Sequence, residues 1–304
     1  MQLCLMKRDL LKPTADIVFK RIFGQEKEIT IEFINLFIDP PHPVVDLEFL
    51  PQEMLPDVVD GKISIVDVRC IDSIRQQFII EMQLVHHVGF NQRALLYAAR
   101  AYSQQLKKGM PYSDAQPVYL LNIINHTIKA NPEKWLHHLS VIDRIDPEFE
   151  VPGINLIFLE LAKRKNLGNF SIDNPVDRWL TFLAEPEKIL AMTKFDLSVY
   201  PNLMKAAELL DESNYTQAQL DAYDRHLMAV YDINRSRIES FDKGFEEGVE
   251  IGEERGVEKG REEGMDLSVI IIKELQKREL SHEEIATKHG VELQVVIKLA
   301  AALK

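Results

Sequence analysis

Two neighbouring runs of Ile, Val and Phe, residues 62–71 and 78–85, constrain the fold of this chain most strongly. Both runs are apolar on both faces of a strand, which is typical of strands inside a sheet that is covered on both sides. A third run, 44–50, precedes them, and a fourth, 117–124, follows a helix-like segment at 91–108. Helical patterns also open the chain. We therefore expect an α/β fold in the order helices, three strands, helix, strand.

The predicted helices have recognisable ends. Thr14 is the expected N-cap of the first helix, which stops near Gly24, and a second helix covers about Glu26 to Phe37. Residues 154–161 are the best candidate for a further strand, and 175–237 have a helical pattern. In the helix at 91–108, one apolar stripe recurs at helical spacing and is expected to face the sheet; it consists of Leu95, Ala99, Tyr102 and Leu106.

Polar residues interrupt the two buried runs where apolar ones are expected. Asp67 stands between two valines, and Glu81 and Gln83 are two residues apart, so they point to the same face of their strand. A hairpin between the runs would bring Asp67 level with them. Two buried carboxylates repel each other unless a cation or a proton compensates. Oxygen ligands of this kind suit Mg²⁺ or Mn²⁺, which activate water and stabilise charge on a phosphodiester.

Two alternatives to a metal site remain open on the residues alone. Asp67 and Glu81 could lie on an exposed strand edge, or they could pair with Arg69 or Arg75. The following helix carries a polar stripe that is either a plain solvated face or a means of positioning a phosphate. That stripe consists of Arg93, Tyr97, Arg100, Gln104 and Lys107.

Charge and cysteine content limit the partners and the compartment. The net charge is −12, yet residues 1–130 hold 14 basic and 15 acidic residues, against 22 and 33 in the rest. The front half is therefore not electrostatically barred from DNA. Only Cys4 and Cys70 are present, which excludes a disulfide framework and favours a reducing cytoplasm. No apolar run reaches the length of a membrane span, so no membrane partner is expected.

Six glycines recur at every fourth position of the acidic stretch 241–265. In an isolated helix they would cost roughly 5–6 kcal/mol relative to alanine. Apolar residues in step with them form a narrow seam, along which two copies could wrap around each other: Phe241, Phe245, Val249 and Val257. We expect a homo-oligomer, and the alternative is a flexible acidic linker. Ser281 and Glu284 form a capping-box pair in a small helical unit that follows.

In their order along the chain, several short motifs resemble the recombination-promoting nucleases, also called PD-(D/E)XK nuclease family transposases. This family belongs to the restriction-endonuclease-like superfamily. The resemblance covers nearly the whole chain and is densest over 14–125. It rests on residues 14–20 with Phe23-Gly24, 65–68, 79–83, Arg93 with Tyr97, Gln105-Leu106 with Gly109 and Tyr112, and 117–119.

The resemblance implies an αβββαβ core in which Asp67 and Glu81 bind a divalent metal. The superfamily usually has Lys two residues after the Glu, whereas this chain has Gln83, as the family's own pattern does. Gln can orient a water but cannot accept its proton. Asp16 is either a further carboxylate of the site or only an acid favoured by the helix dipole. One of the two histidines at 86 and 87 is a candidate proton shuttle.

The prediction is a cytoplasmic, Mg²⁺- or Mn²⁺-dependent DNA endonuclease linked to recombination or mobile elements. Asp67 and Glu81 would hold the metal and Gln83 would orient water. Arg93, Tyr97 and Arg100 would position the site or the DNA. The expected parts are a nuclease-like domain at 1–172 and a helical region at 173–240. A glycine-rich helix or linker at 241–265 and a small helical unit at 266–304 follow. The alternatives are a non-catalytic DNA-binding or transposition accessory protein and an oligomeric interaction scaffold.

Overall fold

The computed structural model of the chain describes residues 10–55, 63–128, 131, 133–164, 171–191 and 197–303. These residues belong to two compact units, which meet between Asn234 and Arg235 along the sequence. Among the helices of these ranges, none combines the length and the apolar character needed to cross a lipid bilayer.

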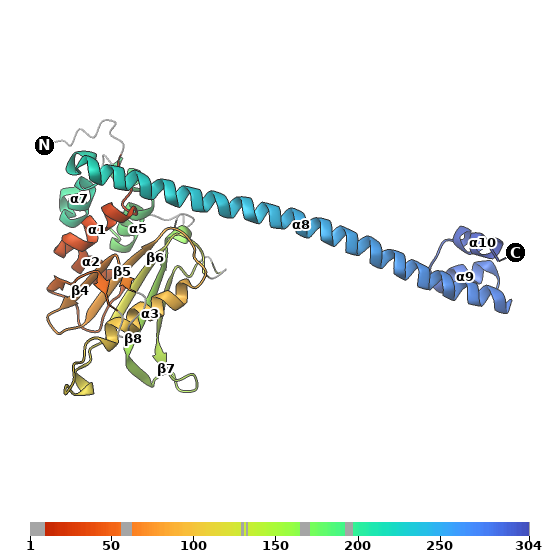
Figure 1. Cartoon of the computed structure of the whole chain (residues 1–304), viewed down its shortest axis with the longest axis horizontal. Coiled ribbons are helices and arrows are strands. Elements are labelled where there is room, and N and C mark those ends of the chain that lie inside the picture. Colours follow the sequence, from red (N-terminus) through yellow and green to blue (C-terminus); the bar gives the residue numbers. More distant parts are fainter. Residues whose placement is uncertain are drawn as a thin grey trace. The chain divides into compact units, whose positions relative to one another are not determined.

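A six-stranded mixed sheet forms the centre of the first unit (Figure 1). Its strands in spatial order are β1 (Leu47–Phe49), β4 (Val68–Asp72), β5 (Gln77–Gln83), β6 (Val118–Ile124), β8 (Glu150–Glu160) and β7 (Leu136–Ile142). The β5–β6 and β6–β8 pairs are parallel, and the other pairs are antiparallel. A separate two-stranded pair joins β2 (Glu53–Met54) to β3 (Ser64–Ile65). The predicted α/β fold is confirmed.

Helices cover both faces of this sheet, as the two-sided apolar strands predict. Alternate residues of β5 point to opposite faces, so Phe78 and Ile80 join one core cluster and Ile79 joins the other. The first cluster packs the sheet against α1 (Asp16–Gln25), α2 (Lys27–Phe37), α5 (Pro175–Ala184), α6 (Pro186–Leu190) and α7 (Pro201–Glu208). The second packs it against α3 (Phe90–Ser103), which Figure 1 shows across the sheet from α1 and α2.

Trp179 of α5 is the centre of the larger cluster. Its side chain is fully buried against the rings of Phe23, Phe33 and Phe182. The indole N–H donates to Glu32 Oε1 at 2.8 Å, so its polar atom is satisfied at the edge of the core. Helices that follow the sheet in sequence thus share a core with the helices that precede it. The predicted domain limits at 172 and 240 stay predictions.

The long helix α8 spans Gln217–Lys277 without interruption and includes all six repeated glycines. It begins in the first unit and ends in the second, which also contains α9 (His282–His289) and α10 (Leu293–Ala301). Ile271 of α8, Ile285 of α9 and Val296 of α10 are buried and form a small cluster of their own. The predicted capping box is confirmed, because the Ser281 and Glu284 side chains each bind the other residue's main-chain N–H. The short remaining elements are α4 (Leu161–Arg164) and the 3-10 turns η1 (Tyr112–Asp114), η2 (Leu197–Val199) and η3 (Glu212–Asn214).

Two local predictions are wrong, and one strand was not predicted. Ala15, not Thr14, is the N-cap residue of α1, and no side chain caps that helix. The run predicted at 62–71 is two strands, since the chain leaves the ladder at Val66 and Asp67 between β3 and β4; Lys62 lies outside the described residues. Strand β7 was not singled out, because its mostly exposed residues include two histidines and lack the apolar alternation of a half-buried strand.

The apolar stripe predicted to face the sheet is wrong by about one residue of rotation, although one of its members, Tyr102, does pack against the second cluster. The buried residues are Phe90, Ala94, Ala98 and Ala101, whereas the Leu95 side chain is 51% exposed. Both sets have helical spacing, so periodicity alone favours the one with larger apolar residues. Small side chains at Ala94, Ala98 and Ala101 instead let the helix backbone lie close to the sheet.

Lengthening Ala98 and Ala99 to leucine tests this orientation. We expect Ala98→Leu to lower the free energy of unfolding by about 1–3 kcal/mol, because a fully buried site must be overpacked. Ala99→Leu makes the same change one residue on, at a partly exposed position, and is expected to cost less than about 0.5 kcal/mol. Urea unfolding followed by Trp fluorescence measures both variants, since the two tryptophans, Trp135 and Trp179, lie in the first unit. Equal losses in the two variants would contradict this orientation.

Candidate active site

Asp67 and Glu81 converge at one end of the β4–β5 ladder. Val68 of β4 is opposite Ile80 of β5, so the preceding Asp67 lies level with Glu81. Two main-chain hydrogen bonds brace the pair. The Asp67 N–H donates to Glu81 Oε1 at 2.9 Å, and the Met82 N–H donates to Asp67 Oδ2 at 2.9 Å. The Gln52 amide adds a third bond by donating to the Asp67 carbonyl oxygen at 2.6 Å.

Both carboxyl groups are held in surroundings that oppose their charge. Burial, followed by the neighbouring Asp67, raises the pKa of Glu81 to about 8. Burial also raises the pKa of Asp67, although the Met82 N–H and the Lys20 ammonium act in the opposite direction. Neither acid pairs with Arg69 or Arg75 in the described structure: Arg69 donates to Gln77 Oε1 at 2.9 Å, at the far end of β5. The pair therefore lacks a full compensating charge.

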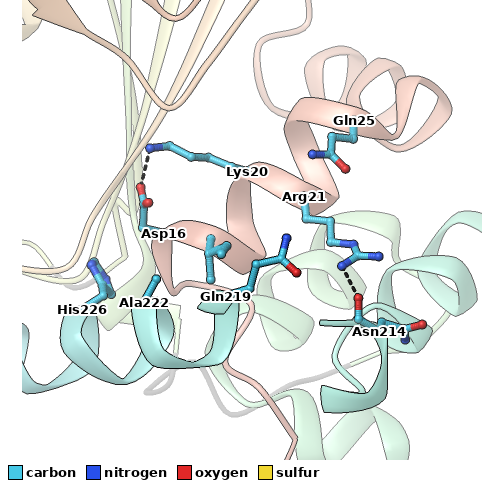
Figure 2. Close-up of a pocket in the computed structure, with 9 residues that line it drawn as sticks. Asp16, Lys20, Arg21, Gln25, Asn214, Gln219, Ala222 and His226 are labelled. Carbon is cyan, nitrogen blue, oxygen red and sulfur yellow. Dashed lines mark hydrogen bonds and ion pairs between the residues drawn. The ribbon is translucent and has the colours of Figure 1, made fainter. Parts of the chain in front are cut away.

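Lys20 of α1 is a cation close to this pair, on the face of the sheet that α1 and α2 cover. Its Nζ lies 3.6 Å from Asp67 Oδ1. It also lies 2.7 Å from Asp16 Oδ1, the contact drawn in Figure 2. Burial lowers the pKa of Lys20, but the hydrogen bond and charge of Asp16 and the charges of Asp67 and Glu81 outweigh it and raise the pKa. Asp16 thus lies beside the two acids but is tied to Lys20. Its part in the site stays a prediction, and Lys20 is a neighbour of the acids that the sequence pattern does not single out.

Gln83 connects β5 to α3. Its Nε2 donates to the Val85 carbonyl oxygen at 2.6 Å, and Arg93 donates to its Oε1. Arg93 also lies over the ring of Phe90, 5.6 Å from its centroid. Two partners therefore fix the amide of Gln83, and one oxygen lone pair remains for a water.

The polar stripe of α3 is not simply solvated. Arg93 contacts Gln83, Arg100 donates to Ser64 Oγ, and Gln104 donates to the Leu55 carbonyl oxygen at 2.7 Å. Burial, and next the charge of Glu81, raise the pKa of the Tyr97 phenol, which places this ring in the field of the acid pair. Only Lys107 at the end of the stripe is exposed. The stripe therefore connects the site to the two-stranded pair.

A cavity of about 210 Å³ opens beside Asp67. It is lined by Thr14, Asp16, Asp67, Met82, Gln83, Leu84, Val85, His87, His226, Ala229, Val230 and Ile233. His87 is one of the two histidines expected as candidates, whereas His86 packs edge-to-face on His126. His226 comes from the first turns of α8, far along the sequence. Nothing in its local pattern separates it from other surface histidines, so no sequence signal was available.

The donor set suits a hard divalent cation that keeps several waters. Among the described residues, no three Asp, Glu, His or Cys side chains are grouped closely enough to enclose a metal ion. Mg²⁺ commonly needs only one or two carboxylates, with waters and phosphate oxygens completing an octahedron. Asp67 and Glu81 supply two, and their mutual repulsion is what a cation would relieve. The residues present therefore fit such an ion.

A family model for the PD-(D/E)XK nuclease family transposases matches residues 13–240. The match runs from α1 into α8 and contains every residue of the site described above. No curated protein and no solved structure matches the chain. Because the match covers most of the chain, the protein belongs to the PD-(D/E)XK nuclease family transposases.

Proposed function

We propose that the protein is a metal-dependent DNA endonuclease that hydrolyses phosphodiester bonds in recombination or in mobile-element activity. Family membership indicates a nuclease or transposase-related hydrolase, and PD-(D/E)XK nucleases generally use divalent metals. The observation that carries the proposal is the braced, charge-repelling pair of Asp67 and Glu81. Such a pair is costly to bury in a protein that never binds a cation there.

Asp67 and Glu81 would hold the ion, for which Mg²⁺ and Mn²⁺ are the candidates. The ion would supply an activated water and would stabilise charge on the phosphate that is cut. Glu81 must lose its proton before it can bind a cation, so metal binding is expected to release a proton and to strengthen as the pH rises towards 8. Lys20 lies close enough to Asp67 to share its charge and to meet a phosphate oxygen.

Gln83 cannot act as the base, because a carboxamide does not accept a proton at neutral pH. We propose that it orients a water with its free lone pair and holds Arg93 with the other. Arg93 keeps several N–H donors for a DNA phosphate, and Tyr97 lies within the field of Glu81. Arg100 is bound to Ser64, so its proposed role is to position α3 against β3.

The rival functions share the fold but not the need for the acid pair. A non-catalytic DNA-binding or transposition accessory protein would use the basic side chains and would gain nothing from two partly buried carboxylates. An interaction scaffold would depend on the acidic tail alone. The presence of both acids, braced within one hairpin, favours the enzyme over either rival.

Plasmid cleavage by variants of the acid pair tests the enzyme directly. We expect Asp67→Asn and Glu81→Gln each to lower Mg²⁺- or Mn²⁺-dependent cleavage by roughly a thousandfold or more, because metal stabilisation of the transition state is worth several kcal/mol. Glu48→Gln removes an exposed carboxylate on β1 and serves as the matched control. Cleavage that persists in both site variants would reassign the active site. No cleavage by the native chain with either metal would favour the accessory role.

The superfamily's usual lysine can be introduced at Gln83 as a second test. We expect Gln83→Lys to lower cleavage by about tenfold or more, because the new ammonium would meet the guanidinium of Arg93 instead of accepting its hydrogen bond. Gln77→Lys is the matched control, since Gln77 accepts from Arg69 in the same way at the other end of β5. Steady-state cleavage rates with thermal melting of each variant provide the measurement. Full or increased activity of Gln83→Lys would show that the Gln83–Arg93 contact is dispensable.

We further propose that the protein works as a homo-oligomer in a reducing cytoplasm. Within the described structure, a Cβ built on any of the six repeated glycines of α8 meets no atom within 4 Å apart from the adjacent residues and backbone of its own helix. The apolar side chains in step with them are exposed, from 45% at Val249 to 73% at Val257. A second copy of this helix could lie close against such a surface. The compartment rests on the scarcity of cysteine and on the burial of free Cys70.

Replacing both Gly248 and Gly252 by alanine distinguishes a helix that packs against a second copy from a helix that stands alone. Each Gly→Ala change stabilises an isolated helix by about 1 kcal/mol, so helicity should rise in either case. If the glycines permit close approach, the double variant should dissociate at higher protein concentrations than the native chain. Sedimentation equilibrium over a range of concentrations measures this, with Ser236→Ala and Ser240→Ala on the same helix as the control. A native mass equal to one chain at all concentrations would remove the oligomer.

A further inference from the structure

A second cavity, of about 480 Å³, adjoins the candidate active site. Figure 2 shows the residues that line it. It is lined by Asp16, Ile17, Lys20, Arg21, Gln25, Asn214, Gln219, Ala222 and His226, from α1, η3 and the first turns of α8. Asp16 and His226 also line the smaller cavity that contains Asp67. The two cavities are therefore neighbours across these two side chains. Apart from Lys20 and Asp16, the lining of the larger cavity has no part in the chemistry proposed at the acid pair.

The larger cavity concentrates positive charge in a chain whose net charge is −12. Its lining contains two cations, Lys20 and Arg21, and one carboxylate, Asp16, which pairs with Lys20 at 2.7 Å. Arg21 is held in place before any ligand binds, because it donates to the Asn214 carbonyl oxygen and lies over the Tyr215 ring, 4.6 Å from the centroid. A guanidinium fixed in this way keeps further N–H donors and loses little conformational entropy when an anion arrives.

Two neutral side chains add hydrogen-bonding capacity. Gln219 Oε1 accepts from the Thr216 N–H at 2.8 Å, which fixes the amide and leaves its NH₂ group as a donor. The Nε2 atom of His226 is buried and has no hydrogen-bond partner among the residues that the structure describes. Buried polar atoms without a partner are rare in folded proteins and call for an explanation such as a bound ligand.

We propose that this cavity binds a backbone phosphate of the DNA strand, next to the phosphate that is cut at Asp67 and Glu81. The inference rests on the proposed endonuclease function and extends it to a defined subsite. Ammonium, guanidinium and amide N–H groups are the donors with which proteins fix the register of a nucleic-acid backbone. Of the nine lining residues, none is Phe, Tyr or Trp, so the cavity offers no stacking platform for a base. The bound phosphate would hold the strand so that its neighbour reaches the acid pair.

DNA binding at several salt concentrations tests the subsite separately from cleavage. The full-length chain is titrated with a fluorescent duplex, with Ca²⁺ in place of Mg²⁺, and binding is measured by anisotropy. We expect Arg21→Gln to weaken binding about tenfold, the loss of one charged hydrogen-bonded contact. The slope of log affinity against log salt should fall by about 0.9, the value for one phosphate contact. Arg21→Lys should keep the slope.

Two further variants complete the design. Arg144→Gln makes the same charge change at an exposed position outside the cavity and should leave the slope unchanged. Gln219→Glu keeps the oxygen that accepts from Thr216 and adds a negative charge to the cavity, so it should weaken binding even if Arg21→Gln does not fold. A native slope in folded Arg21→Gln, native affinity in Gln219→Glu, or an equal loss in Arg144→Gln overturns the subsite. Failure of the native chain to bind DNA overturns the endonuclease proposal itself.

Discussion

The arrangement of the site depends on two crossed hydrogen bonds between a carboxylate and a main-chain N–H. Glu81 accepts from the N–H of Asp67, and Asp67 accepts from the N–H of Met82, the residue after Glu81. The separation of the two acids is therefore set by the hairpin ladder rather than by side-chain rotamers alone. Each bond also stabilises a charged oxygen, which offsets part of the cost of burying it. What remains is the cost of burial and, for Glu81, the repulsion by Asp67 that follows it, and a bound cation would offset both.

The interruption between strands β3 and β4, at Val66 and Asp67, allows this geometry. Had residues 62–71 formed one regular strand, Asp67 would have been a ladder residue with its N–H directed to a neighbouring strand. Instead β3 leaves to form a separate pair, and the freed N–H meets Glu81. The helices on the two faces of the sheet then each contribute a cation. Lys20 comes from α1 and Arg93 from α3, and both lower the pKa of Glu81 against the effect of burial.

The parts of the structure that sequence predicts are those with a local pattern. Apolar residues on both faces of a run predict a buried strand. A polar residue in such a run stands out, so the sequence itself singles out Asp67, Glu81 and Gln83. The rotation of α3 is predicted wrongly from the sequence, because alanine contributes little to a hydrophobic stripe. Small size is nevertheless what a close contact between helix and sheet needs. Lys20 and His226 are not identified from the sequence, for another reason. Their importance depends on which distant segments lie beside them, and neither has a distinctive local context.

The replacement of the superfamily's lysine by Gln83 changes where the positive charge at the site comes from. A lysine two residues after the acid would carry a charge and a proton that it can lose, whereas Gln83 offers neither. Arg93 supplies the charge through its contact with Gln83, but a guanidinium does not deprotonate in proteins. In the proposed hydrolysis, neither side chain of this pair would accept the water proton, which would pass to a substrate phosphate or to solvent. Under the proposed function, a site built in this way would depend more on a divalent ion for activating water than one that contains a basic side chain.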